Sequence, residues 1–352
     1  MKKILLTAVA LLWASAANAF ILNGEFNANS YVHTPLAPNA SLNPNSAAIV
    51  RELIQNSQGG FSVSVGDYAM PIYIVTNEPT VQIKGARAWD PTFDQWGKTQ
   101  LEAHLNAVPI PSVFAPATGN DKSALIYRPA TNELWELWGA ELTGQTTVNS
   151  NGETVSEWSA GWGGHMTNVT SNPGYFLEDP RFPGYKWGAN ATSIAHLGTT
   201  ITIEEQRRGV INHPLSFATT VTSSDGFVFP AQRGDGWAPG ALVKQGMIFR
   251  FPASLNLDAL GLSPYALMIA KAIQKYGMIL TDTSGGGFTS IGAEGQGANS
   301  HPGFTSVYWD VGSGILGCGD PPPNNYSCWP DSGHLLARIP WNQLQVIQPP
   351  AP

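Results

Sequence analysis

Residues 132–141, "NELWELWGAE", bring acidic and aromatic side chains together within one short segment. In an extended strand successive side chains point to opposite faces, so Glu136 and Trp138 share a face. A carboxyl group buried against an indole ring has a raised pKa, which suits a general acid, and indole rings stack on the apolar faces of sugars. The segment predicts either a glycan-facing site, with Glu136 as acid and Trp138 as sugar platform, or a core strand in which Glu136 pairs with an arginine such as Arg128.

A second group of this kind lies in residues 157–169, "EWSAGWGGHMTNV". We expect this segment to pair with the first as a hairpin, which would bring Trp162 and His165 near Glu136, with Asn168 following as a polar contact. A histidine can act as a base near neutral pH, and the glycines allow the backbone to approach a ligand or another strand closely. The alternative is that His165 is an ordinary surface histidine with satisfied hydrogen bonds.

A third group comprises "EEQRRGVINHPLSF" at 204–217 and "FPAQRGDG" at 229–236. A polysaccharide lyase needs a base and groups that neutralise a uronate carboxylate, and His213 with Gln232 and Arg233 would supply them if these segments are adjacent. A glycoside hydrolase instead needs two carboxyl groups across the scissile bond. The carboxyl pairs to consider are Glu136 with Glu204, Glu205 or Asp235. The simpler interpretation assigns Glu204 and Glu205 to helix capping and Asp235 to a turn.

Other chemistries have little support in the sequence. The glycine-rich segment 285–297 lacks the Lys-Ser/Thr of a phosphate-binding loop, and neither a G-x-S-x-G elbow nor an H-E-x-x-H motif occurs. We therefore expect no cofactor and no metal centre. Loop aspartates could also bind a calcium ion, but the sequence contains no calcium-binding motif that supports this.

The N-terminus predicts export from the cytoplasm. Residues 1–19 combine two lysines, a short apolar run and the small residues Ala17-Asn18-Ala19, which is typical of a signal peptide cleaved before Phe20. We expect a secreted or periplasmic protein without a membrane span, because no apolar run reaches about 20 residues. In an oxidising compartment Cys318 and Cys328 would form a disulfide. The chain has a formal net charge of −7 and no basic cluster, so we expect no nucleic-acid partner.

The remaining patterns predict a mainly β fold. Helices are expected from Asn45 or Ser46 to about residue 58, from Ser263 to Tyr276, and from Thr202 to Gly209, each with capping signals. Short segments rich in β-branched and aromatic residues predict strands at 61–66, 71–76, 124–128, 133–139, 157–163, 226–230, 246–251 and 306–310. Their spacing favours an antiparallel β-sandwich or jelly roll with a few packed α-helices. We expect one β-rich domain over residues 20–352, with a Gly/Pro-rich C-terminal region from about 285 that loops over the surface.

The order of several segments resembles a group of secreted bacterial proteins. The segments are "PLAPNASLNPNSAAIVREL", "LWELWGAE", "GWGGHMTNV" with "NPGYF", "WGANATSIAHLGTTITIEEQRRGVINHPLSF", and "LDALGLSP" with "KYGMIL". The resemblance covers most of the chain after residue 19. It implies export and a single-domain architecture, and it transfers no catalytic residue.

The sequence thus predicts a secreted protein that degrades or binds an extracellular polysaccharide. As an enzyme it would be a lyase or a hydrolase, with Glu136 and His165 or His213 in acid and base roles. The alternatives are a non-catalytic surface or matrix protein that binds glycan through the same tryptophans, and a structural exported protein whose tryptophans are all core.

Overall fold

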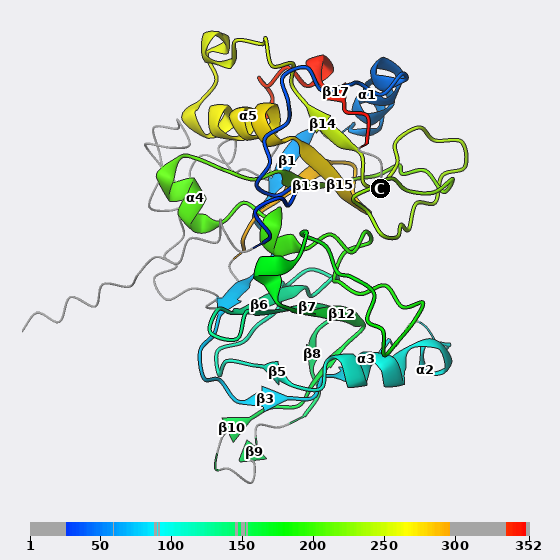
Figure 1. Cartoon of the computed structure of the whole chain (residues 1–352), viewed down its shortest axis with the longest axis vertical. Helices are drawn as coiled ribbons and strands as arrows, with labels where there is room; N and C mark the ends of the chain where they lie inside the picture. The colour runs from blue at the N-terminus through cyan, green and yellow to red at the C-terminus, as the bar shows by residue number, and fades with distance from the viewer. Residues whose placement is uncertain are drawn as a thin grey trace, which may run out of the picture.

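The computed structural model describes residues 26–295 and 336–349, except 59, 88–89, 91, 145–146, 149–151 and 153. The predicted signal peptide, the strand expected at 306–310 and the pair Cys318 and Cys328 lie outside these residues. Within the described residues the chain is mostly sheet with a few short helices (Figure 1). The predicted mainly β class with packed helices is confirmed, whereas a sandwich or jelly roll is not.

Two larger sheets organise the chain. A six-stranded sheet has the order β1-β16-β13-β15-β14-β17, and a four-stranded sheet has the order β12-β7-β6-β2. In Figure 1 the six-stranded sheet lies above the four-stranded one. The strands of the larger sheet are β1 (Phe61–Ser64), β13 (Leu215–Thr219), β14 (Ile248–Arg250), β15 (Met278–Thr283), β16 (Thr289–Gly292) and β17 (Gln345–Val346). Those of the smaller sheet are β2 (Ile72–Ile74), β6 (Ala124–Arg128), β7 (Glu133–Trp138) and β12 (Trp162–Thr167).

Both large sheets contain parallel pairs, so the expectation of an antiparallel system is wrong. β1 pairs with β16, β13 with β15, and β2 with β6 in parallel. Parallel neighbours need long crossovers, and here the chain between β13 and β15 makes β14 and a helix before it returns. Within the described part of the glycine-rich region, residues 285–288 are exposed as expected, whereas residues 289–292 form β16, which lies between β1 and β13 rather than in a surface loop.

Three small sheets accompany the four-stranded sheet. They comprise β3 (Thr80–Val81) with β5 (Val108–Pro109), β9 (Thr147–Val148) with β10 (Thr154–Val155), and β11 (Trp158–Ala160) between β4 (Lys84–Gly85) and β8 (Glu141–Leu142). The segment predicted as a strand at 157–163 is therefore divided between β11 and the start of β12. The segment at 226–230 forms turns around a cis Phe229–Pro230 bond rather than a strand.

The three predicted helices are present. They are α1 (Ser46–Asn56), α4 (Ile203–Arg208) and α5 (Pro264–Tyr276). Helices α4 and α5 form the caps that predicted them, whereas Asn45 makes no side-chain capping hydrogen bond to α1. The Ser263 side chain accepts a hydrogen bond from the backbone N–H of Ala266, and α4 begins with a capping box between Thr202 and Glu205. Two further helices, α2 (Phe93–Trp96) and α3 (Lys98–His104), were not predicted. Short 3-10 helices are η1 (Val169–Ser171), η2 (His196–Gly198), η3 (Leu257–Leu260) and η7 (Trp341–Gln343).

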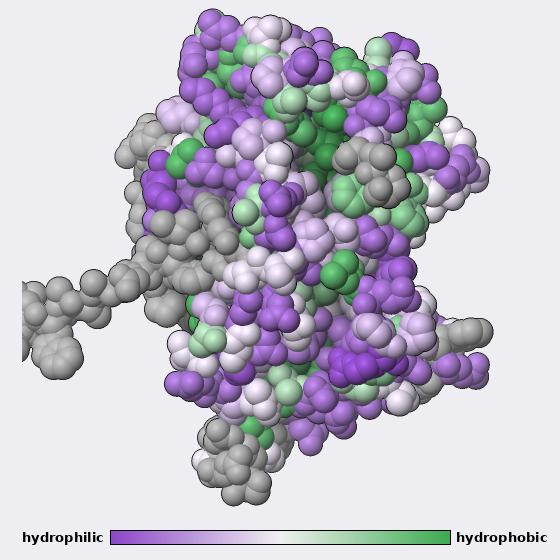
Figure 2. Space-filling view, in the orientation of Figure 1, coloured by the Kyte–Doolittle hydropathy of each residue, from purple (hydrophilic) through white to green (hydrophobic). Residues whose placement is uncertain are grey.

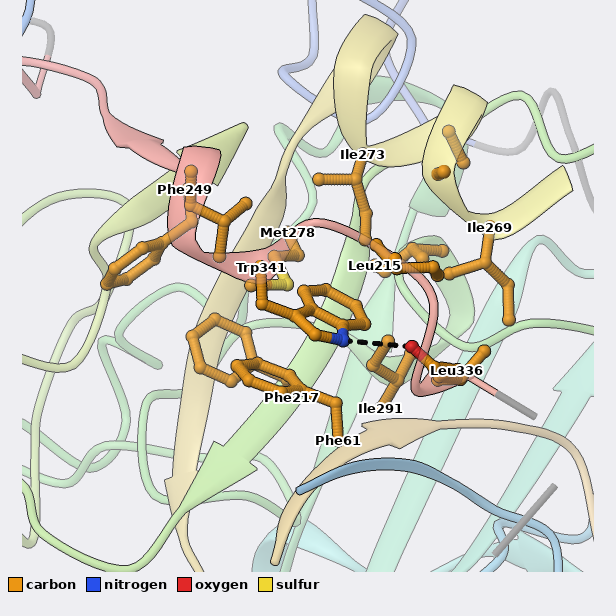
Figure 3. Packing of buried hydrophobic residues seen from close by; sticks show 14 of the residues in the cluster. Phe61, Leu215, Phe217, Phe249, Ile269, Ile273, Met278, Ile291, Leu336 and Trp341 are labelled. Carbon is orange, nitrogen blue, oxygen red and sulfur yellow. Dashed lines mark hydrogen bonds between the residues drawn. The ribbon is translucent and has the colours of Figure 1, made fainter. Parts of the chain in front are cut away.

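Each large sheet packs its own hydrophobic cluster. The cluster of the six-stranded sheet is joined by α1, α5 and η7, and Figure 3 shows Trp341 at its centre. The ring of Trp341 stacks on that of Phe61 with 3.9 Å between ring centroids, and its indole N–H donates to the Leu336 carbonyl at 3.1 Å. The second cluster packs α3 against the four-stranded sheet.

The surface seen in Figure 2 mixes hydrophilic and hydrophobic residues. Hydrophobic residues reach the surface on the upper right, in the area of the yellow-green loops of Figure 1. Phe227 and Trp237 from these loops are 46% and 62% exposed. Among the helices that the structure describes, none combines the length and apolar character needed to cross a bilayer.

Candidate active site

Glu136 lies in the middle of β7 and is fully buried. The β6–β7 hairpin turns through Asn132 in the left-handed region (φ 59°), and β12 pairs with β7 on the other side, as predicted. The Glu136 carboxyl faces the chain segment 189–197 and accepts a hydrogen bond from the backbone N–H of His196 at 2.6 Å. Burial raises the pKa of Glu136 to about 8, although the nearby backbone N–H groups of that segment lower it. This enclosed position favours a structural role.

His165 lies on the opposite face of the same sheet. Glu136 is the cross-strand partner of Gly164, whereas His165 is the partner of Trp135 and stacks on its ring with 4.7 Å between centroids. The His165 ring is held by Glu133, with 2.9 Å between Nε2 and Oε1, and burial lowers its pKa. The structure therefore does not bring Glu136 and His165 together as an acid–base pair.

His213 is a buried structural histidine that follows α4 and contacts the first turn of that helix. Its Nε2 lies 3.0 Å from Oε2 of Glu205, the capping residue of the helix, and its Nδ1 lies 2.7 Å from the Pro214 carbonyl. Burial opposes protonation, yet the charge and hydrogen bond of Glu205 raise the pKa of His213 overall. Gln232 donates to the Pro230 carbonyl at 2.9 Å, and no hydrogen bond joins it to His213 among the described residues.

Asn168 follows β12 and is exposed. It has a left-handed backbone (φ 55°) that precedes η1, and its carbonyl accepts a hydrogen bond from the Ser171 hydroxyl at 2.9 Å. Its position is explained by the turn, because Asn tolerates this conformation better than most residues.

Trp138 and Trp162 are cross-strand partners at one end of the β7–β12 pair, and both are partly exposed. The Trp138 indole N–H donates to Oδ1 of Asp121 at 3.1 Å. The Trp162 ring stacks on Trp187 with 5.0 Å between centroids, and the guanidinium of Arg87 lies 5.1 Å from its centroid. Trp138 is thus a partly exposed ring that is hydrogen-bonded to an acidic side chain. Trp162 is stacked on Trp187.

Arg233 is held by the chain segment at residues 188–190. Its Nη2 donates to the carbonyls of Gly188 and Asn190 at 3.0 and 2.6 Å, while its Nε is buried without a hydrogen-bond partner among the described residues. Burial lowers the pKa of Arg233 to about 10, and the charges of Asp282 and Asp235 act in the opposite direction. These two carboxyl groups are therefore the electrostatic partners of the guanidinium.

Asp282, near the end of β15, was not singled out from the sequence. Its carboxyl accepts hydrogen bonds from the backbone N–H groups of Thr283 and Ala191. Burial raises the pKa of Asp282 to about 8, and the negative charges of Asp235 and Asp121 raise it further in the same direction. The residue as a whole is partly exposed, although burial of its carboxyl group is the largest cause of the raised pKa. The raised pKa favours the protonated form of Asp282 near neutral pH, and the charges of two other carboxyl groups contribute to it.

Asp235 is exposed, and its charge is one of the two that raise the pKa of Asp282. Its Oδ1 accepts hydrogen bonds from Gln245 Nε2 at 2.6 Å and from the Thr283 hydroxyl at 2.9 Å. Because Thr283 also donates its backbone N–H to Asp282, this residue contacts both carboxyl groups. We name Trp138, Asp121, Arg233, Asp235 and Asp282 the Asp282 cluster.

An open pocket of about 510 Å³ is lined by residues that are close in sequence to Asp235 and Asp282. Ser284 lines it and follows Asp282 by two residues, and Trp237 lines it and follows Asp235 by two residues. The pocket is lined by Asn56, Gln58, Thr220, Val221, Trp237, Ser284, Gly285, Gly286 and Gly287.

Within the part of the chain that the structure describes, no group of three or more His, Cys, Asp or Glu side chains is arranged to hold a metal ion. The chain matches no protein-family model, no curated protein and no solved structure.

Proposed function

We propose that this protein hydrolyses an extracellular polysaccharide at the Asp282 cluster. The observation that carries the proposal is that Thr283 contacts the carboxyl groups of both Asp282 and Asp235, while burial and the charges of Asp235 and Asp121 raise the pKa of Asp282. A carboxyl group with a raised pKa near a second, ionisable one is what a glycoside hydrolase needs for its acid and base. Trp138 offers a ring on which a sugar can stack, and the hydrogen bond from its indole N–H to Asp121 holds that ring in place. Export, which the N-terminal residues predict, gives the enzyme access to such a substrate.

In this proposal Asp282 is the general acid. It donates its proton to the glycosidic oxygen as the bond between that oxygen and the anomeric carbon breaks. Asp235 accepts a proton from the water that attacks the anomeric carbon. Both hydrogen bonds to Asp235 reach Oδ1, which leaves Oδ2 available to that water. Proton exchange with solvent then returns both carboxyl groups to their starting states.

Hydrolysis is supported better than elimination. A lyase needs a base such as His or Tyr beside the groups that bind a uronate, but the hydrogen bonds of His213 go to Glu205 and Pro214. The groups that act electrostatically on Arg233 are Asp282, Asp235 and Arg87 instead. A non-catalytic glycan-binding protein is the second candidate, because the pocket at Trp237 could retain a glycan without cleaving it.

The test is to incubate the purified protein with a panel of neutral and uronate polysaccharides and to measure new reducing ends and ultraviolet-absorbing unsaturated products. We expect reducing ends without unsaturated products. Asp282→Asn should lower the rate by at least about a hundredfold, the usual contribution of general acid catalysis. Asp258→Asn is the matched control, because Asp258 lies in η3 and pairs with Lys271 at the surface. Wild-type rates in Asp282→Asn, or unsaturated products, would exclude the mechanism.

A further inference from the structure

The side chain of Trp237 is 62% exposed, whereas Trp135, Trp187 and Trp341 are buried in the two hydrophobic clusters. The exposed ring is held in place, because its indole N–H donates to the Thr220 carbonyl at 3.1 Å. The backbone N–H of Trp237 also donates to the Thr222 carbonyl at 3.1 Å. Folding gains little from a large apolar ring left in water, yet this ring is fixed and therefore pre-organised for contact with a ligand.

The side chains around this ring are uncharged. The pocket of about 510 Å³ is lined by the amides Asn56 and Gln58, the hydroxyls Thr220 and Ser284, one valine, three glycines and Trp237 itself. This volume lies within the range of roughly 300–1,000 Å³ that small-molecule sites occupy. An aromatic platform with amide and hydroxyl groups complements a ring that has an apolar face and hydroxyl edges, and it offers no cation to a carboxylate, sulfate or phosphate.

The glycines keep the pocket open. A Cβ added at Gly285 or Gly287 would meet no atom within 4 Å, and at Gly286 only the Ser284 hydroxyl at 3.9 Å. A Cβ at Gly285 would therefore have open space around it, so a substitution at this pocket residue should leave the fold intact. This gives a way to fill the site without disturbing the fold.

We infer that the Trp237 pocket is a binding subsite for a neutral sugar ring. The inference names the substrate class and so rests on the proposed glycan-directed function. Thr283 connects the pocket to the Asp282 cluster, because it precedes the pocket residue Ser284 and its hydroxyl donates to Asp235. One polysaccharide chain would thus place one ring on Trp237 and present a neighbouring linkage to Asp282.

The experiment is isothermal titration calorimetry with neutral oligosaccharides of glucose, mannose, xylose and N-acetylglucosamine, and with oligouronates as the charged comparison. At least one neutral oligosaccharide should bind, and Trp237→Ala should weaken it by about tenfold, which corresponds to one aromatic stacking contact. Trp237→Phe should weaken it less, and Gly285→Leu should weaken it by filling the pocket. Phe227→Ala is the control, since Phe227 is 46% exposed but does not line the pocket.

The outcomes separate this inference from the catalytic proposal. If Asp282→Asn binds like the wild type but does not cleave, both stand. If binding depends on Trp237 and the wild type cleaves nothing, the subsite stands and hydrolysis falls. If Trp237→Ala binds every neutral oligosaccharide like the wild type, or only oligouronates bind, the subsite is overturned. Thermal unfolding of each variant shows that a lost signal does not come from lost folding.

Discussion

Replacing Glu136 with glutamine should change how stability depends on pH. The pKa of Glu136 is raised from 4.5 to about 8 in the folded protein. Between these two values the folded state holds a proton that the unfolded state has lost, so the free energy of unfolding falls as pH rises through this window. At about 1.4 kcal/mol per pH unit, this single carboxyl accounts for at most about 5 kcal/mol of lost stability at pH 9 relative to pH 4.

The glutamine side chain cannot ionise, so Glu136→Gln should be free of this loss. At pH 5 the variant should be less stable than the wild type by about 1–2 kcal/mol, because its amide N–H₂ faces backbone N–H groups and lacks acceptors. Its Oε1 can still accept from His196 as the carboxylate does. At pH 9 the order should reverse, and the variant should be the more stable protein.

The measurement is urea unfolding followed by tryptophan fluorescence at pH 5, 7 and 9. Glu141→Gln serves as the control, because Glu141 is exposed at β8 and pairs with Lys122 at the surface. The control should follow the wild-type curve at each pH. If Glu136→Gln loses as much stability as the wild type between pH 5 and pH 9, the buried proton does not reside on Glu136.

The remaining predictions concern the cluster, a helix cap and a close contact. Hydrolysis should decline above about pH 8, as Asp282 loses the proton that it donates, and a pH–rate profile checks this. Thr202→Ala should cost about 1 kcal/mol in urea unfolding, since it removes the N-cap of α4. Gly164→Ala should destabilise by about 1–3 kcal/mol, because its Cβ would lie 2.6 Å from the Phe176 ring, whereas Gly285→Ala should be nearly neutral in the same assay.

The parts of the fold that sequence could predict are those with local causes. Ser263 and Gly277 bound α5, Thr202 and Gly209 bound α4, and Asn132 turns the β6–β7 hairpin. In each case a few neighbouring residues determine the backbone conformation. Strand direction has no such local cause, because β13 and β15 are parallel partners that lie about sixty positions apart in the chain. The alternation of apolar residues is the same for parallel and antiparallel pairs.

The same distinction explains what was found at the candidate site. The sequence predicted that the two tryptophan-containing segments pair, and β7 and β12 do, but the register that places Trp138 opposite Trp162 and Glu136 and His165 on opposite faces was not predicted. Asp282 is an ordinary residue in "LTDTSGG" until the fold supplies the charges of Asp235 and Asp121 and the backbone of Ala191. Those neighbours come from distant segments, so spacing gives no hint of them.

Glu136 and Asp282 share a pKa of about 8 but not a chemical environment. Glu136 is sealed among backbone N–H groups, and no substrate reaches a fully buried carboxyl. Burial is also the main cause of the raised pKa of Asp282, but this residue is partly exposed and the charges of Asp235 and Asp121 raise its pKa further. A raised pKa alone therefore does not identify a catalytic acid, and access together with charged neighbours decides between the two.

Glu136 and the Asp282 cluster contact the same chain segment, residues 188–196. His196 binds Glu136, Ala191 donates its backbone N–H to Asp282, and the carbonyls of Gly188 and Asn190 hold Arg233. Residues 188–196 thus connect the four-stranded sheet to the Asp282 cluster. Glu136 attaches this segment to β7 through His196, and the backbone N–H of Gly188 attaches it to the Gly163 carbonyl of β12, so the residue that the sequence suggested as the acid has a structural contact in this fold.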